Sequence, residues 1–328
     1  MDSQTLDSMT ANHAVPVSSA QSLAWRNGEF IAADALCVPV GDAGFVLGAT
    51  VTEQLRTFRG QLFLCQQHSD RLQHSLAVVG IQPAQELDEI VIAAAELATH
   101  NYGLHASLPQ FAGDLGLVIF ITPGNQPSQH EGRTSPPLVA IHTFPLAFAL
   151  WAEAYRVGMS LRSVVVQQVP EACWPVQAKV RSRLHYFLAD READAAERGS
   201  RAVLCHGDGR VSETSTANIA IVKDGVISTP PSSDALRGVS LFYLRQLAES
   251  LGMLWQERSL QKKDLAKADE ILLTSTPNCL LAATRYDGEL IGTGHPGPVQ
   301  KQLLAAWSQS VGVDIAAQAV AIASESLS

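Results

Sequence analysis

Alternating and continuous apolar runs, separated by turn signals, predict short strands and helices in the first half of the chain. The segment "LAWRNGEFIAA" has the pattern of a β-hairpin that turns at Asn27, because Asn-Gly is the strongest two-residue turn signal. Continuous apolar runs in "LGLVIFIT" and "PLVAIHTF" predict buried strands. The segment "QLFLCQQHSDRLQHSLAVVGI" predicts a strand and then a helix that is capped at Ser69 or Asp70 and ends at Gly80. A second helix, in "ELDEIVIAAAELATHNYG", is predicted to end at Gly103.

The hydrophobic pattern is interrupted by a Pro- and Gly-rich segment at residues 122–135, which predicts a loop. After the next strand comes "PLAFALWAEAYRVG", and we place a domain boundary there, near residue 150. The expected organisation is a loose polar tail over residues 1–22, a small α/β domain over 23–150 and a larger domain over 151–328.

In the second half, a helix is predicted to begin at Lys179, because the apolar residues Leu184, Phe187 and Leu188 follow it at helical spacing. Hairpins are predicted in "RAVLCHGDGRVSET" and "NIAIVKDGVISTP", where Gly-Asp-Gly and Asp-Gly mark the turns. Further segments predict a helix over about 239–251, a strand in "ADEILLTSTPN", a hairpin in "RYDGELIG" and a final helix in "VQKQLLAAW". The mixture of strands and helices in both halves indicates an α/β (α+β) fold.

The composition of the 328-residue chain is that of a folded globular protein, since it is 46% hydrophobic and 17% charged. A net charge of −9, without a dense Lys/Arg patch, argues against a nucleic-acid partner. No apolar run approaches the length of a membrane span, and the first residues lack the basic and apolar regions of a signal peptide. We therefore expect a cytoplasmic protein with no membrane partner.

Motifs of metal and nucleotide enzymes are weak or missing. The five cysteines are scattered without a C-x-x-C pair, and His68 and His74 lack the i, i+4 spacing of helical metal ligands, so no metal site is expected. The segment "GTGHPG" at residues 292–297 matches G-x-G-x-x-G, but too little chain follows it for a dinucleotide-binding domain. Neither G-x-S-x-G nor a P-loop occurs in the sequence.

An ordered set of motifs points to one family. They are "GDAGFVLGATVTEQLRTFRGQLFLCQQHSDRLQHS", "VQAKVRSRLHYFLADREADAAERG", "GRVSETSTANIAIVKDGVISTP", "DALRGVSLFYL", "ADEILLTSTPN" and "DGELIGTGHPGP". From about Trp25 to Gly312 the chain resembles the class IV (fold-type IV) pyridoxal-phosphate enzymes, which include branched-chain and D-amino-acid aminotransferases and 4-amino-4-deoxychorismate lyase. The resemblance implies a homodimeric enzyme of two domains, with pyridoxal 5'-phosphate in the cleft between them.

The resemblance implies a catalytic pair, Lys179 and Glu213. Lys179 matches the lysine that holds the cofactor aldehyde as a Schiff base and then moves a proton from the substrate α-carbon. Burial near a cationic ring would lower the pKa of this amine and make it available near neutral pH. Glu213 matches the carboxylate that keeps the cofactor ring nitrogen protonated. Either residue alone is more simply explained as an ordinary charged residue, but their joint position in the pattern favours catalysis.

The resemblance also implies the other residues that bind the cofactor. They are Arg56, Leu236, Gly238, Val239, Ser240, Ser275 and Thr276. Arg56 matches a cation that grips the phosphate, and Leu236 matches an apolar residue that packs on the ring. The segment "LRGVS" begins a helix, where free backbone N–H groups form an anion site, and "TST" matches a second phosphate loop.

Departures from the family pattern concern the substrate more than the cofactor. Ser182 replaces a common Asn, and Pro123 lies where D-amino-acid aminotransferases carry a carboxylate-binding Arg. Pro277 has no N–H to offer a substrate carboxylate. The resemblance therefore implies amino-group transfer between an amino acid and a 2-oxo acid, branched-chain-aminotransferase-like, with little activity on D-alanine.

Three alternatives remain open from the sequence alone. The nearest is a 4-amino-4-deoxychorismate lyase that releases pyruvate and 4-aminobenzoate, because "KVRSRL" is similar to the segment of that enzyme. An oxidoreductase that binds a dinucleotide would depend on "GTGHPG", and a non-catalytic binding protein would explain the departures. The lyase would retain pyridoxal phosphate and the oxidoreductase would retain NAD or NADP, whereas the binding protein would show neither a bound cofactor nor turnover.

Overall fold

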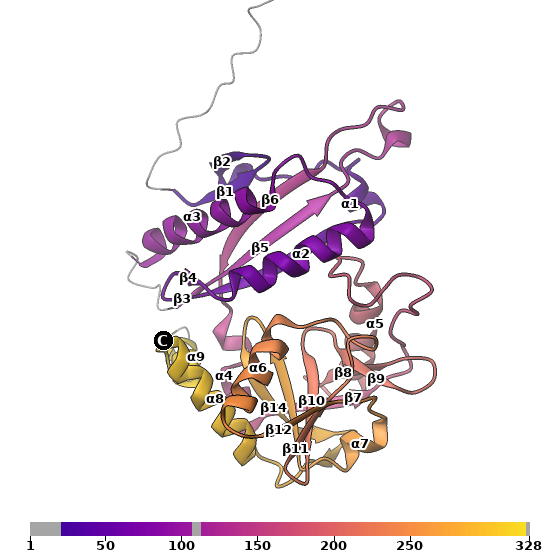
Figure 1. Ribbon diagram of the computed structural model, residues 1–328, viewed down its shortest axis with the longest axis vertical. Helices are drawn as coiled ribbons and strands as arrows, with labels where there is room; N and C mark the ends of the chain where they lie inside the picture. Colours follow the sequence, from indigo (N-terminus) through magenta and orange to yellow (C-terminus); the bar gives the residue numbers. More distant parts are fainter. Residues whose placement is uncertain (1–20, 107–112, 326–328) are drawn as a thin grey trace, which may run out of the picture.

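The computed structural model describes residues 21–106 and 113–325, which form two β-sheets flanked by helices (Figure 1). The first sheet has the strand order β2-β1-β6-β5-β3-β4, and every pairing in it is antiparallel. Its strands are β1 (Leu23–Arg26), β2 (Glu29–Ala32), β3 (Val51–Phe58), β4 (Gln61–Leu62), β5 (Leu115–Thr122) and β6 (Leu138–Pro145). The tail predicted over residues 1–22 lies almost entirely outside the described residues.

The two faces of the first sheet have different neighbours, because side chains alternate along each strand. On one face, Val51, Leu55 and Ile119 pack in a core with helices α2 (Cys65–Val79) and α3 (Leu87–Ala106). The opposite face carries a smaller apolar cluster that contains Val118 and Phe120. Thr52, Gln54 and Val118 of this second face line the site described below.

The second sheet has the order β12-β11-β10-β13-β14-β7-β8-β9, with β15 beside β14. Its strands are β7 (Met159–Ser163), β8 (Arg201–Cys205), β9 (Val211–Thr214), β10 (Asn218–Lys223), β11 (Val226–Thr229), β12 (Leu254–Glu257), β13 (Glu270–Ser275), β14 (Cys279–Tyr286) and β15 (Glu289–Leu290). Strand β9 also pairs with β10, through Asn218 opposite Glu213. The strands from β10 through β13, β14, β7 and β8 to β9 therefore form a closed ring, and Glu213 lies in the strand pair that closes it.

Helices flank the second sheet (Figure 1), and the last of them contacts the first half of the chain through Gln318, which donates to Asp114. They are α4 (Ala152–Val157), α5 (Leu184–Ala196), α6 (Val239–Ser250), α7 (Lys262–Ala266), α8 (Pro298–Val311) and α9 (Ile315–Glu325). The short pieces outside them are α1 (Ala43–Val46), η1 (Ala33–Ala35), η2 (Pro127–Gln129) and η3 (Phe148–Leu150). Among residues 21–106 and 113–325, none of the helices combines the length and apolar character needed to cross a bilayer.

Most strands and turns predicted from the pattern are confirmed. Asn27 has a φ of 48° in the turn between β1 and β2, and Asp224 has a φ of 50° in the turn between β10 and β11. These are left-handed conformations that Asn, Asp and Gly adopt most readily. The two continuous apolar runs of the first half are the central strands β5 and β6.

Three predicted helix ends are wrong. Helix α2 begins at Cys65, so Ser69 and Asp70 lie inside it and do not cap it, and α3 continues past Gly103 to Ala106. Lys179 does not begin a helix, because α5 starts five residues later. The segment around Lys179 is extended and bridges to the edge of β3, an interaction with a distant strand that local spacing cannot reveal.

Candidate active site

A cavity of about 500 Å³ is lined by residues of both sheets, which is the size of a small-molecule site. Its charged lining is strongly positive although the chain carries a net charge of −9. The Lys, Arg, Asp and Glu side chains in this lining are Arg71, Lys179, Arg181, Arg183, Arg201 and Glu213. Five cations and one carboxylate around one cavity favour an anionic ligand.

Backbone contacts to the first sheet and to α2 fix Lys179. Its N–H donates to Ser75 Oγ at 3.1 Å, and its carbonyl oxygen accepts the N–H of Thr52 at 3.0 Å. The side chain is partly buried in the cavity lining. Burial, and then the positive charge of Arg71, lower the pKa of Lys179 to about 8. About a tenth of this amine is therefore neutral, and so nucleophilic, at pH 7, far more than for an ordinary lysine.

Glu213 is a buried carboxylate that accepts hydrogen bonds from two side chains. Its Oε1 accepts the hydroxyl of Tyr186 at 2.6 Å, and its Oε2 accepts Nδ2 of Asn218 at 3.1 Å. Burial raises the pKa of Glu213, and the Tyr186 hydrogen bond and the positive charge of Lys179 oppose that rise. A carboxylate held in this way is ready to pair with a cationic N–H in the cavity.

Asn218 joins the carboxylate to the start of α6. Its Nδ2 also donates to the carbonyl oxygen of Leu236 at 2.9 Å. A Cβ at Gly238 would lie 1.8 Å from Asn218 Oδ1, so only glycine fits at the N-cap of α6. Sequence reasoning missed Asn218 and Tyr186. For Asn218 the sequence did offer a signal, because an amide at the start of the otherwise apolar strand "NIAIV" is expected to be buried and to need hydrogen-bond partners.

The N-terminus of α6 opens into the cavity. The lining contains Gly238, Val239 and Ser240 of this end, and also Ser275 and Thr276 at the end of β13. The first backbone N–H groups of a twelve-residue helix have no partners within the helix and carry its positive dipole end. Together with the hydroxyl groups, they form a cradle for a phosphate-sized anion.

Arg71, on α2, is the guanidinium beside this cradle. Its Nε and Nη2 donate to the two oxygens of Glu53, each at 2.8 Å, and its Nη1 donates to the carbonyl oxygen of Arg237 at 2.9 Å. Burial would raise the pKa of Glu53, but Arg71 and His68 lower it to about 2. Sequence reasoning missed Arg71, although the segment "HSDRL" places an arginine inside an amphipathic helix.

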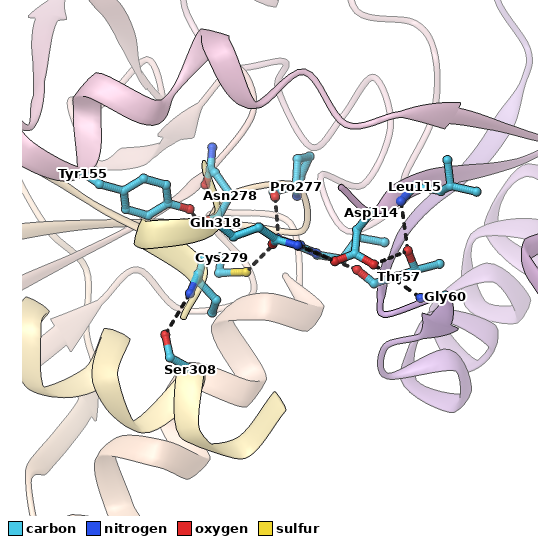
Figure 2. A network of polar contacts seen from close by, with 12 residues as sticks. Thr57, Gly60, Asp114, Leu115, Tyr155, Pro277, Asn278, Cys279, Ser308 and Gln318 are labelled. Atoms are coloured by element: carbon cyan, nitrogen blue, oxygen red, sulfur yellow. Dashed lines mark hydrogen bonds and ion pairs between the residues drawn. The ribbon is translucent and has the colours of Figure 1, made fainter. Parts of the chain in front are cut away.

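Arg56, which the sequence assigns to the phosphate, does not line this cavity. It is buried, and its Nη1 donates to the carbonyl oxygen of Pro277 at 2.9 Å and to Sγ of Cys279 at 3.3 Å. Its Nη2 lies 3.8 Å from Oδ2 of Asp114. Figure 2 shows this network around Asp114, which also accepts Nε2 of Gln318 at 2.9 Å. Arg56 therefore joins the first sheet to the turn after β13 instead of facing a ligand.

The other sequence-predicted site residues come together in the cavity. They are Lys179, Glu213, Leu236, Gly238, Val239, Ser240, Ser275 and Thr276. In the part of the chain that the structure describes, no three His, Cys, Asp or Glu side chains are placed to hold a metal ion.

Comparison with known proteins agrees with this geometry. Residues 50–286 match the family described as amino-transferase class IV, so the chain belongs to the class IV aminotransferase family. The D-alanine aminotransferase of Bacillus licheniformis is 28% identical over 287 residues, which cover 87% of this chain and 95% of that protein. The branched-chain-amino-acid aminotransferase of Escherichia coli (strain K12) is 27% identical over 287 residues, 85% of this chain and 89% of that protein.

Solved structures confirm the fold. The branched-chain aminotransferase of Escherichia coli has a TM-score of 0.77 at 24% identity, over 88% of this chain and 94% of that chain. The branched-chain aminotransferase of Thermobaculum terrenum in its PLP form has a TM-score of 0.77 at 20% identity, over 90% of this chain and 95% of that chain. The family and the mixed α/β fold inferred from the sequence are both confirmed.

Proposed function

We propose that this protein transfers an amino group between an amino acid and a 2-oxo acid, with pyridoxal 5'-phosphate as its cofactor. The observation that carries the proposal is the convergence of Lys179, Glu213 and the N-terminus of α6 on one cavity. The relatives described above are aminotransferases, which favours aminotransfer over the lyase alternative.

The cavity has donors suited to each polar part of this cofactor. The N–H groups at the start of α6, with Arg71 and the hydroxyl groups of Ser275 and Thr276, would hold the phosphate. Lys179 would bind the aldehyde covalently, and Leu236 would supply an apolar surface for the ring. When bound, the cofactor supplies an electron-withdrawing ring that stabilises negative charge at the substrate α-carbon.

The protein residues then control protons. A Lys179 amine with a pKa of about 8 would accept the proton from the substrate α-carbon. It would then donate that proton to the carbon that carried the cofactor aldehyde, which completes the transfer of the amino group. Glu213 would keep a proton on the ring nitrogen, and Tyr186 and Asn218 hold its carboxylate in place for that role. The two groups work together because one removes the proton and the other keeps the ring cationic.

A homodimer is part of the proposal, because an apolar surface lies exposed beside the cavity. On segment 40–47, Val40 is 81% exposed and Phe45 is 71% exposed, and on α5 Leu184 is 68% exposed. The two segments meet where Ser182 Oγ donates to the carbonyl oxygen of Gly48 at 2.7 Å. Exposed apolar patches of this kind mark interfaces. Analytical ultracentrifugation should find a dimer, and an active monomer would exclude it.

Two further expectations belong to the proposal. We expect the first sheet to belong to a small domain over residues 23–150 and the second to a larger domain over residues 151–328. A reducing compartment such as the cytoplasm suits the five cysteines, none of which forms a disulfide among the described residues.

Amino acids supplied singly, without an acceptor, test the function. The enzyme loaded with pyridoxal 5'-phosphate is mixed with L-leucine, L-glutamate or D-alanine, and conversion of the cofactor to its pyridoxamine form is followed by absorbance. Conversion by an L-amino acid, reversed by 2-oxoglutarate, supports aminotransfer. Pyruvate release from 4-amino-4-deoxychorismate, without conversion by any amino acid, would establish the lyase instead.

A further inference from the structure

The cations that line the cavity differ in whether they already have partners. Arg71 and Arg201 are paired with carboxylates, and Arg183 donates to a backbone carbonyl oxygen. Arg181 is different, because within residues 21–106 and 113–325 no acceptor or carboxylate contacts its guanidinium. Its Cζ lies 5.5 Å from the centroid of the Phe120 ring. Arg181 is thus an exposed cation of the cavity lining whose guanidinium has no hydrogen-bond or ion-pair partner among the described residues and is open to a ligand.

The bridge between Val180 and Val51 determines where Arg181 points. Val180 packs on the core side of the first sheet, with Val51. In an extended chain, side chains alternate and residues two apart lie about 6.5 Å apart on one face. Lys179 and Arg181 therefore share the face opposite to Val180. Both backbones are tied to β3, since the N–H of Arg181 donates to the carbonyl oxygen of Thr50 at 2.9 Å.

Arg181 and Arg71 approach the cavity from opposite sides of the first sheet. Arg71 belongs to α2, which packs on the face that carries Val51 and Leu55. Arg181 lies over Phe120, which belongs to the cluster on the other face. The guanidinium of Arg181 is therefore separate from the cation assigned to the phosphate. It is available to a second anionic group of a bound ligand.

We propose that Arg181 is a specificity-determining residue that pairs with the carboxylate attached to the reacting carbon of the amino-acid substrate. The inference depends on the proposed function, which brings that carbon to Lys179. The carboxylate is one bond from the carbon, and Arg181 projects from the same face two residues further along the chain. Arginine suits this role because its planar fork matches both oxygens of a carboxylate. The adjacent Phe120 excludes water from one side of the pair.

Binding of an unreactive ligand isolates the carboxylate. Wild type, Arg181→Met and Arg181→Lys, each loaded with cofactor, are titrated with 4-methylpentanoate and with 4-methylpentanamide by isothermal calorimetry. Arg285→Met, an exposed arginine on β14, is the control. Arg181→Met is expected to weaken binding of the carboxylate about 10- to 100-fold, as for loss of a charged hydrogen bond, and to leave the amide unchanged. Arg181→Lys should restore part of the loss.

Kinetics distinguish the two carboxylates of a dicarboxylic substrate. Arg181→Met should raise KM for L-leucine and L-glutamate alike, since both carry the carboxylate on the reacting carbon. A rise for L-glutamate alone would place Arg181 at a distal carboxylate and overturn the proposal. Equal loss for 4-methylpentanoate and its amide, or no loss for either, would also overturn it. If the wild type converts no amino acid, the proposed function itself fails, which is a separate outcome.

Discussion

Replacing Glu213 with glutamine removes one negative charge and keeps the shape of the side chain. Two side chains donate to the carboxylate, the Tyr186 hydroxyl at 2.6 Å and Nδ2 of Asn218 at 3.1 Å, in addition to the backbone of Leu236. A glutamine amide has one acceptor, so its oxygen would turn toward Asn218 and its NH2 toward Tyr186. Facing an NH2 group, which only donates, the Tyr186 O–H would lose its buried acceptor. The Tyr186 oxygen already accepts Nε2 of Gln168 at 3.1 Å, so the new NH2 would also compete with that hydrogen bond. We expect a loss of about 1–3 kcal/mol in the free energy of unfolding.

The effect on the reaction should be larger than the effect on binding of the cofactor. The amide cannot keep a ring nitrogen protonated, so the negative charge at the substrate α-carbon loses its stabilisation. A transition state that loses about 3 kcal/mol is reached about 100-fold more slowly. The rate is measured in single turnover by stopped-flow absorbance, with saturating L-leucine and no acceptor. Cofactor retention is measured by equilibrium dialysis and should stay within a few-fold of wild type.

Tyr186→Phe is the matched control for Glu213→Gln. It removes one hydrogen bond to the carboxylate and keeps the charge, so it should slow the same step less than about 10-fold. A Glu213→Gln enzyme that reacts within threefold of wild type would show that the carboxylate has only a structural role. Equal slowing in both variants would mean that orientation, not charge, is what the site needs.

Three further predictions concern the lysine, the phosphate and pH. Lys179→Ala should abolish covalent capture of the cofactor, which borohydride reduction and mass spectrometry detect on the Lys179 peptide of wild type. In wild type the initial rate of capture should rise with pH up to about 8 and then level, because the neutral amine is the nucleophile. Arg71→Met is tested in a Glu53→Gln background, so that no buried carboxylate is left unpaired, and it should raise the Kd of the cofactor about 10- to 100-fold. Arg56→Met in wild type should mainly lower the Tm. The reverse ranking of the two variants would assign the phosphate to Arg56. Glu53 has a pKa of about 2 against an ordinary value of 4.5, so its stabilisation is present above pH 4.5 and is lost as the pH falls toward 2. The difference in unfolding free energy between wild type and Glu53→Gln should therefore shrink by about 2 kcal/mol between pH 5 and pH 3, and a constant difference would contradict this linkage.

Local patterns predicted the strands well because the causes of strand formation are themselves local. Turn residues such as Asn27 and Asp224 adopt left-handed backbone conformations within a few residues of the strands they join. The apolar runs that became β5 and β6 needed no distant information, since each is long enough to cross a core and too short for a buried helix.

The site needed information from far along the chain. The pairing of Arg71 with Glu53 joins a helix to a strand, and no periodicity within either segment indicates it. Arg56 was misplaced for a related reason. A motif gives the position of an arginine along β3, but the turn at Pro277, 221 residues away, determines what its guanidinium meets. Lys179 and Glu213 were found together only because their order along the chain matches a family, since either alone is an ordinary charged residue.

The contacts that hold Lys179 have a consequence for folding. Its backbone N–H is bound to Ser75, 104 residues earlier, and its carbonyl oxygen to β3. Contacts over such separations form late, because a long loop must close first. Until the first half of the chain has docked, Lys179 is an exposed lysine with an ordinary pKa near 10.5. We therefore expect Lys179 to gain its reactivity toward an aldehyde at neutral pH only once these long-range contacts have formed.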